Sequence, residues 1–207
     1  MTFETYKQSF LRNDLTAFKL LERIIAAVCI TIPVFLRLAD TGANGWRSSI
    51  SDYVYMDNSH VFGMMLCMAS MLFIVNGAVF FKNENKHDLN SSSKWYNIAL
   101  GLSLLGVIIF PYKEYGVPHF TFAGLFFAGN AFVTVAAARH KKHLALRWLM
   151  GVFTAIFLVL FFVNDYFKLH LQWLSWLSLF WAEWLSLTVI GIHFILESGN
   201  LQYASDL

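Results

Sequence analysis

The sequence is poor in charge and in proline. Charged residues make up 14% of its 207 residues and hydrophobic residues 57%, whereas soluble domains carry roughly 25% charged residues. Only three prolines are present, so little interrupts long helices. This shortage of charge excludes an ordinary water-soluble domain and predicts a protein whose main solvent is lipid.

The sequence also lacks a basic stripe and any cysteine motif. The formal net charge is +2, too small for the basic footprint that nucleic acids require, so no nucleic-acid partner is expected. Cys29 and Cys67 lie inside apolar runs without CxxC or Cys/His ligand spacing, and we interpret both as small buried apolar residues. Residues 1–23 mix acids and bases without an early apolar core, so no signal peptide is expected.

Six apolar runs alternate with short polar loops. A transmembrane helix needs about 20 apolar residues, so the sequence predicts an all-α fold: a polytopic membrane helical bundle in one domain, residues 1–207. The six transmembrane helices are expected at about 20–38, 60–81, 95–112, 119–138, 144–163 and 171–196. Residues 1–19 carry aromatic residues at helical spacing among charges, which predicts a short amphipathic cytoplasmic helix on the membrane surface.

Lysine and arginine are unequally shared between the two sets of loops. Eleven of the 15 fall in the N-terminal segment and in the second and fourth loops. The positive-inside rule then predicts that both termini are cytoplasmic. Three loops share the outer face: 48–60, 111–119 and 164–170. The basic residues of the inner loops are interpreted as ordinary determinants of topology, and Glu22 as a side chain that snorkels to the interface.

One carboxylate is expected deep in the membrane. Glu183 lies near the middle of the last apolar run and has no basic residue at i±3 or i±4. An ionisable group at this depth costs roughly 2.5 to 3.5 kcal/mol on insertion scales, which makes it a candidate functional residue. Asn130 is expected at a similar depth, and an interhelical hydrogen bond between the two would serve as structural glue. Proton transfer or headgroup binding by Glu183 is the alternative.

The outer loops are expected to bring polar side chains together above Glu183. The predicted lipid- or ligand-binding set is Ser49, Ser51, Asp52, His60, His119, Asn130 and Glu183. Two histidines of this set open helices, and with one aspartate they could hold zinc with an open position for water. That zinc set is His60, His119 and Asp52. The alternative is that both histidines simply hydrogen-bond loop backbone.

Catalytic roles are predicted for three residues of the same set. Glu183 would carry a proton, with Asp52 and Ser51 as its companions. The sequence has no HExxH motif. It also has no GxSxG elbow, which argues against a serine hydrolase, and serine and aspartate in such a segment often cap a helix or build a turn.

Several short motifs resemble a known family. SISDY at 49–53, HVFGMMLCMA at 60–69, PHFTFAGLFFAGNAF at 118–132 and WAEWLSL at 181–187 resemble the six-helix DRAM/Frag/Sfk membrane family. That group includes autophagy modulators and lipid-remodelling proteins of GPI anchors, and it has bacterial relatives. Its recurrent positions match Ser51, Asp52, His119 and Glu183. The chain departs from the family pattern at Tyr53, Val54 and Cys67.

The resemblance implies work on or with membrane lipids. The SISDY form is closer to the bacterial branch, which implies a location in the bacterial inner (plasma) membrane. The leading hypothesis is an integral membrane protein that binds or senses membrane lipid through an outer-leaflet polar pocket. One alternative is a metal-dependent membrane hydrolase or lipid-remodelling enzyme that uses zinc. The other is an oligomeric channel or signalling subunit, a homo-oligomer or a protein with a cytoplasmic partner.

Overall fold

The protein is helical throughout the part of the chain that the structure describes. The computed structural model describes residues 3–42, 44–83, 94–136, 144–166 and 178–200, and these residues contain no strand. The helices are α1 (Phe3–Ala39), the short 3₁₀ helix η1 (Ser51–Tyr55), α2 (Ser59–Asn83), α3 (Tyr96–Ile109), α4 (Gly116–Ala136), α5 (Leu144–Tyr166) and α6 (Leu179–Asn200). The predicted all-α fold is confirmed for these residues.

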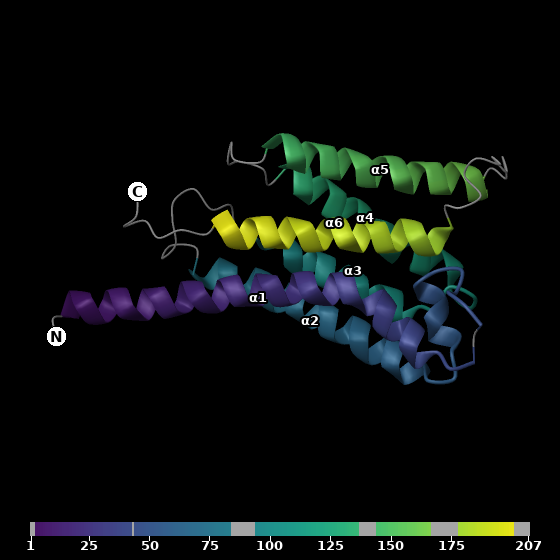
Figure 1. Cartoon of the computed structure of the whole chain (residues 1–207), viewed down its shortest axis with the longest axis horizontal. Helices are drawn as coiled ribbons and strands as arrows, with labels where there is room; N and C mark the ends of the chain where they lie inside the picture. The colour runs from purple at the N-terminus through teal and green to yellow at the C-terminus, as the bar shows by residue number, and fades with distance from the viewer. Residues whose placement is uncertain (1–2, 43, 84–93, 137–143, 167–177, 201–207) are drawn as a thin grey trace.

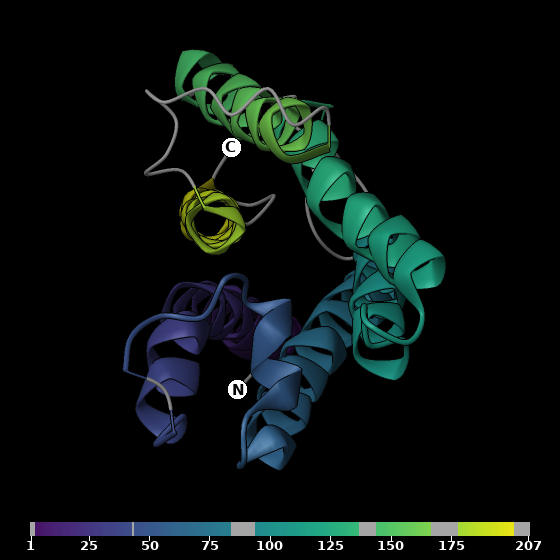
Figure 2. The same cartoon turned by 90° about the vertical axis from the view of Figure 1, so that its right-hand side faces the viewer.

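The α-helices form a closed ring. Each helix packs against the next one in the chain, and α6 packs against α1 (Figure 1 and Figure 2). This order follows from the short connections, which force neighbouring helices to run antiparallel. The contact between α6 and α1 brings the last helix beside the first and encloses an apolar core.

The antiparallel order creates two ends of the bundle. We call one the loop end, because residues 40–42, 44–58 and 110–115 lie there, on the right of Figure 1. We call the other the Lys94 end, where α3 begins and α6 ends. The predicted gathering of the 48–60 and 111–119 loops at one end is therefore confirmed, while the third predicted outer loop, 164–170, extends beyond the described residues.

Three helices are long and apolar enough to cross a membrane. Their apolar stretches are Ser59–Val79, Gly116–Ala136 and Leu179–Gly199, among the residues described. Two further apolar stretches, Tyr96–Ile109 and Leu144–Leu160, are shorter. Each predicted span overlaps one helix, although residues 137–138 of the fourth span and 171–177 of the last lie outside the described chain. The six-span topology itself stays a prediction.

The first helix differs from expectation in its length. Residues 1–19 are predicted as a separate amphipathic helix, but from Phe3 onward they belong to α1, a single helix of 37 residues that continues through Pro33. At 1.5 Å per residue this helix is about 55 Å long, well beyond the roughly 30 Å of a bilayer core. No proline or glycine occurs between Phe3 and Ile32, so the change in polarity near residue 20 does not end the helix.

An aromatic core separates the two ends. Phe73 of α2 lies edge-on to Phe126 of α4 and to Phe194 of α6, with ring centroids 5.6 and 5.3 Å apart. Cys29 is buried in the same core, as predicted, whereas Cys67 is exposed on α2. The exposure of Cys67 corrects the prediction for that residue, because a largely apolar helix gives no periodicity that marks its buried face.

Candidate functional site

The segment around η1 folds back over the loop end. Ile50, Tyr53 and Met56 are all buried, because side chains three residues apart line up on one side of a 3₁₀ helix and here point into the core. The backbone is fixed to α6 as well, since the Phe180 N–H donates to the Ser48 carbonyl oxygen at 2.9 Å. The apolar positions of the SISDY segment thus determine where its polar residues lie.

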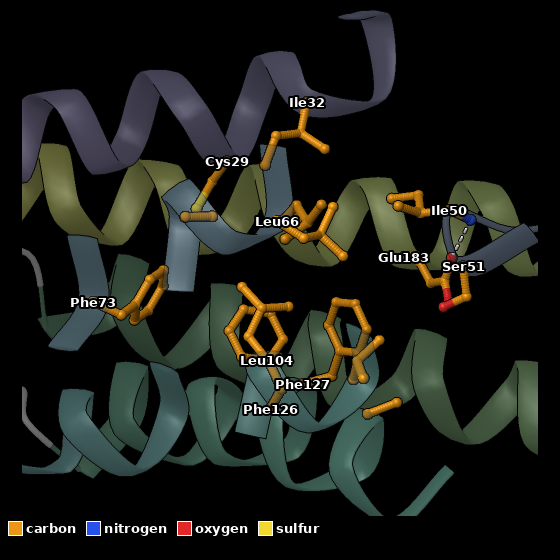
Figure 3. A pocket seen from close by; sticks show the side chains of 14 residues that line it. Cys29, Ile32, Ile50, Ser51, Leu66, Phe73, Leu104, Phe126, Phe127 and Glu183 are labelled. Carbon is orange, nitrogen blue, oxygen red and sulfur yellow. Dashed lines mark hydrogen bonds between the residues drawn. The ribbon is translucent and has the colours of Figure 1, made fainter. Parts of the chain in front are cut away.

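Glu183 meets this segment rather than another helix. It is buried in the first turns of α6, and its Oε2 accepts the Ile50 N–H at 2.5 Å (Figure 3). The predicted partner, Asn130, instead donates to the Phe126 carbonyl of its own helix at 2.8 Å, so the predicted bond between Asn130 and Glu183 is wrong. Because Glu183 lies in the first turns of α6, it is close to the loop end, where a backbone amide reaches it.

Ser51 and His119 form a second polar pair beside Glu183. The His119 Nδ1 lies 2.8 Å from the Phe110 carbonyl oxygen, and its Nε2 lies 3.2 Å from the Ser51 Oγ. A carbonyl only accepts, so Nδ1 carries a proton, and in the neutral ring Nε2 is then the acceptor. The Ser51 hydroxyl therefore donates to Nε2. Both side chains are buried, which favours the neutral imidazole over the charged one.

A small cavity lies directly below these groups. Its volume is about 30 Å³, enough for a water-sized molecule. Figure 3 shows Ser51 and Glu183 at one end and apolar side chains along the rest. The apolar lining comes from helices on different sides of the ring, including Cys29, Leu66, Leu104, Phe126 and Phe127. The cavity is therefore apolar almost throughout, and the hydrogen-bonded groups of Ser51 and Glu183 lie beside one end of it.

Asp52 faces away from the cavity, toward the loop between α3 and α4. Its Oδ1 accepts the Tyr112 hydroxyl at 2.9 Å and its Oδ2 accepts the Ser48 hydroxyl at 3.3 Å. Ser49 is buried, and its Oγ accepts the Asp52 N–H at 3.0 Å. Burial and the hydrogen bond to Asp52 raise the pKa of Tyr112 to about 12. The carboxylate of Asp52 therefore sits at the rim of the site, beside a tyrosine that stays neutral.

The rim also contains residues outside the predicted binding set. Tyr55 donates its hydroxyl proton to the Glu114 Oε2 at 2.7 Å and accepts the Lys113 N–H at 3.0 Å. Lys113 Nζ lies 3.9 Å from the Asp52 Oδ1. The only sequence signal for this cluster is the clustering of charges and tyrosines in PYKEY at 111–115, combined with the predicted meeting of the two loops.

The predicted zinc ligands are not assembled. Across residues 3–42, 44–83, 94–136, 144–166 and 178–200, no group of three His, Cys, Asp or Glu side chains is placed to hold a metal ion. His60 is exposed in the first turn of α2. Both ring nitrogens of His119 already lie within hydrogen-bond distance of other atoms, and Asp52 turns to Tyr112. The structure gives the zinc hypothesis no direct support.

The Lys94 end holds a buried ionic network that the sequence analysis misjudged. Lys94 pairs with Glu22, and its Nζ lies 3.1 Å from the Glu197 Oε2; Arg147 pairs with the other oxygen of Glu197. Lys94, Arg147 and Glu22 are at most 2% exposed, so they neither snorkel nor act only as topology determinants. Burial alone lowers the pKa of Lys94, but the two carboxylates outweigh it and raise the pKa above its ordinary value.

Comparison with known proteins gives a family but no activity. Residues 31–198 match the model of a family of unknown function, DUF7103. The match runs from α1 into α6 and so includes Ser51, His119 and Glu183. No curated protein and no solved structure matches the chain.

Proposed function

Since the chain belongs to the family of unknown function DUF7103, we propose from its own geometry that it is an integral membrane protein that binds a membrane lipid at the loop end. In this proposal six helices span the bilayer and the loop end lies on the outer side. The lipid headgroup meets the rim around Asp52, and the start of the lipid chain approaches the apolar cavity behind Ser51 and Glu183.

The lipid-facing surface supports the membrane part of the proposal. Met64 on α2, Phe132 on α4 and Leu149 on α5 are 68%, 72% and 66% exposed. Large apolar side chains exposed on several helices at once are rare on soluble monomers. They are expected where lipid tails surround the bundle, because lipid imposes no penalty on exposed apolar surface.

The observation that carries the binding proposal is the junction between polar rim and apolar cavity. Ser51 and Glu183 border one end of an apolar cavity. Their polar atoms are hydrogen-bonded to His119 and Ile50, respectively. Asp52, next in sequence to Ser51, is partly exposed at the rim. An amphipathic molecule is the kind of ligand that satisfies both surfaces. At about 30 Å³ the cavity accepts only the first atoms of a chain, so most of the lipid lies along the outside of the helices.

A second candidate function, acyl transfer, is favoured by the Ser51–His119 pair. The Phe110 carbonyl holds His119 in the tautomer whose Nε2 accepts the Ser51 proton, and a base oriented by a third group is the arrangement that activates a serine. Ser51 Oγ would form a bond to an ester carbonyl carbon while its proton moves to Nε2. The departing alcohol would take that proton, and water would then hydrolyse the acyl-serine.

Lipid extraction from purified protein tests the main proposal. Protein isolated in polymer nanodiscs is expected to retain lipid in native mass spectra, and Glu183→Ala is expected to retain less because the backbone around Ile50 loses its anchor. Asp57→Asn, at an exposed position of the same loop, is the matched control. Equal lipid retention in wild type and Glu183→Ala, or none in either, would contradict the proposal.

A serine-reactive probe separates the two candidates. Acyl transfer predicts that a fluorophosphonate labels wild-type protein but neither Ser51→Ala nor His119→Ala. Labelling that persists in Ser51→Ala, or its complete absence from the folded wild-type protein, would count against the enzyme and leave lipid binding untouched.

A further inference from the structure

A cation already lies over one aromatic ring and beside a second at the loop end. The Lys113 Nζ lies 3.9 Å from the centroid of the Tyr55 ring and 5.8 Å from that of Tyr112. The same ammonium is 3.9 Å from the Asp52 Oδ1. Aromatic faces and a carboxylate around one positive charge are the parts of an aromatic cage, the arrangement that recognises ammonium ligands such as choline.

The walls of this cage do not depend on the lysine side chain. The Tyr55 hydroxyl is fixed by Glu114 and by the Lys113 backbone N–H, and the Tyr112 hydroxyl is fixed by Asp52. The two rings meet edge to face, at 85° with centroids 5.5 Å apart. All of these contacts persist if the Lys113 side chain leaves, so the cage is preorganised for another cation.

The Lys113 side chain can readily move out of the cage. It is 53% exposed, and its four-carbon stem is flexible. An ion pair at 3.9 Å on the surface is weak, because water screens both charges. The ring faces can hold a substituted ammonium in the same way as they hold Lys113. Binding of such a ligand does not require the protein to order a flexible side chain of its own.

From this geometry we propose that Tyr55, Tyr112 and Asp52 form a binding site for the ammonium group of a lipid headgroup, of the choline or ethanolamine class, and that Lys113 occupies the site when no lipid is bound. The inference rests on the proposed lipid-binding function and narrows it to headgroups that carry a cation. It also assigns Lys113 as a built-in competitor of that headgroup.

Binding of short-chain lipids tests the proposal. Detergent-purified full-length protein is titrated with dihexanoyl-phosphatidylcholine and, separately, with dihexanoyl-phosphatidylglycerol, which shares the chains but lacks the cation. Wild type is expected to bind the choline lipid more tightly. Lys113→Ala is expected to tighten choline-lipid binding about two- to fivefold, on the scale of an exposed cation–π contact, and to leave glycerol-lipid binding unchanged.

Substitutions in the walls of the cage are expected to weaken binding, the opposite of the effect expected for Lys113→Ala. Tyr55→Leu and Asp52→Asn are expected to weaken choline-lipid binding, whereas Tyr55→Phe keeps the ring face but not the hydroxyl contacts that fix it and is expected to lose less than Tyr55→Leu. A thermal melt of each variant shows that the fold is retained. If Tyr55→Leu fails to fold, the comparison of Lys113→Ala with Lys113→Arg, which keeps the competing cation, tests the same claim.

The outcomes distinguish the two levels of the proposal. Equal binding of both lipids, with no effect of Lys113→Ala, would overturn the ammonium site and leave lipid binding standing. Binding of neither lipid to any variant would overturn both. Competition by tetramethylammonium is expected, but if tetramethylammonium binds while the choline lipid does not, the cage takes a soluble amine and the headgroup assignment fails.

Discussion

The two ends of the bundle bury polar groups by different means. At the Lys94 end, charged side chains from α1, the segment before α3, α5 and α6 pair with one another in the interior. At the loop end, one partly buried ion pair, Asp40 with Arg47, joins neighbouring parts of the chain, whereas Glu183 and His119 rely on main-chain partners, the Ile50 amide and the Phe110 carbonyl. The first arrangement ties helices together, and the second holds a loop in place above a cavity.

This difference indicates that the Lys94 end mainly stabilises the bundle, whereas the loop end is suited to binding. A buried charge that loses its partner is costly, so the Lys94 end tolerates little movement. The loop end keeps partly exposed groups, Asp52 and Tyr112, next to buried ones, and binding sites are commonly found on loops that a rigid scaffold positions. We therefore expect substitutions at the Lys94 end to affect stability first, and those at the loop end to affect binding first.

The largest expected effect is at Lys94. Lys94→Met leaves Glu22 and Glu197 without this cation in the interior and is expected to destabilise the protein by about 3 to 5 kcal/mol, seen as a lower thermal midpoint in detergent. Lys113→Met, at the exposed lysine of the loop end, is the control and should change the midpoint little. The double variant Lys94→Met/Glu22→Gln should recover part of the lost stability. Equal destabilisation by Lys94→Met and Lys113→Met would contradict the proposed difference between the two ends.

A smaller effect is expected at Glu183. Glu183→Ala leaves the buried Ile50 N–H without its acceptor and is expected to cost about 1 to 3 kcal/mol. Glu183→Gln retains a side-chain oxygen and should lose less. Hydrogen exchange of the Ile50 amide reports this bond directly: we expect faster exchange in the alanine variant, and unchanged exchange would show that another group holds the loop.

Removing the Ser51 hydroxyl should have a still smaller effect. Ser51→Ala removes one neutral hydrogen bond to His119, worth about 1 kcal/mol, without leaving a charge unpaired. Thermal unfolding of this variant beside Ser59→Ala, an exposed serine at the start of α2, measures the difference. A loss as large as that at Lys94 would mean that the loop end also carries the stability of the bundle.

The smallest expected effect depends on pH at the Asp40–Arg47 pair. The Arg47 Nε donates to the Asp40 Oδ2 at 2.6 Å, and this bond lowers the pKa of Asp40 below its ordinary value. A folded-state pKa below the unfolded one stabilises the fold above the ordinary aspartate pKa of about 3.9, and the stabilisation is lost as pH falls through the folded value. Unfolding midpoints from neutral to acidic pH should therefore fall more in wild type than in Asp40→Asn. Parallel curves would contradict this.

Much of the fold follows from the hydrophobic pattern. The predicted run 60–81 and the helix Ser59–Asn83 differ by only two residues at most, because apolar length and loop polarity are local properties. The meeting of Ser51, Glu183 and His119 at one end was also predictable, since antiparallel short connections place alternate loops together. These inferences need only the order of the elements along the chain.

The partners across the bundle could not be predicted in the same way. Glu22 and Lys94 are 72 residues apart, and a count of basic residues per loop does not record which of them are buried. The cage that Tyr55, Tyr112 and Asp52 form around Lys113 depends on how two loops lie against each other, and hydrophobic periodicity carries no information about that. The expected Asn130 partner of Glu183 failed for a related reason, because the position at which α6 begins sets the depth of the carboxylate.

The uninterrupted first helix has a mechanical consequence. Its Glu22 is anchored in the bundle by Lys94, while the same rigid rod continues back to Phe3, a further arm of about 28 Å at 1.5 Å per residue. A rotation of about 10° at the anchor would swing the tip by about 5 Å. A small rearrangement among the packed helices is thereby amplified into a displacement that a neighbouring molecule could detect.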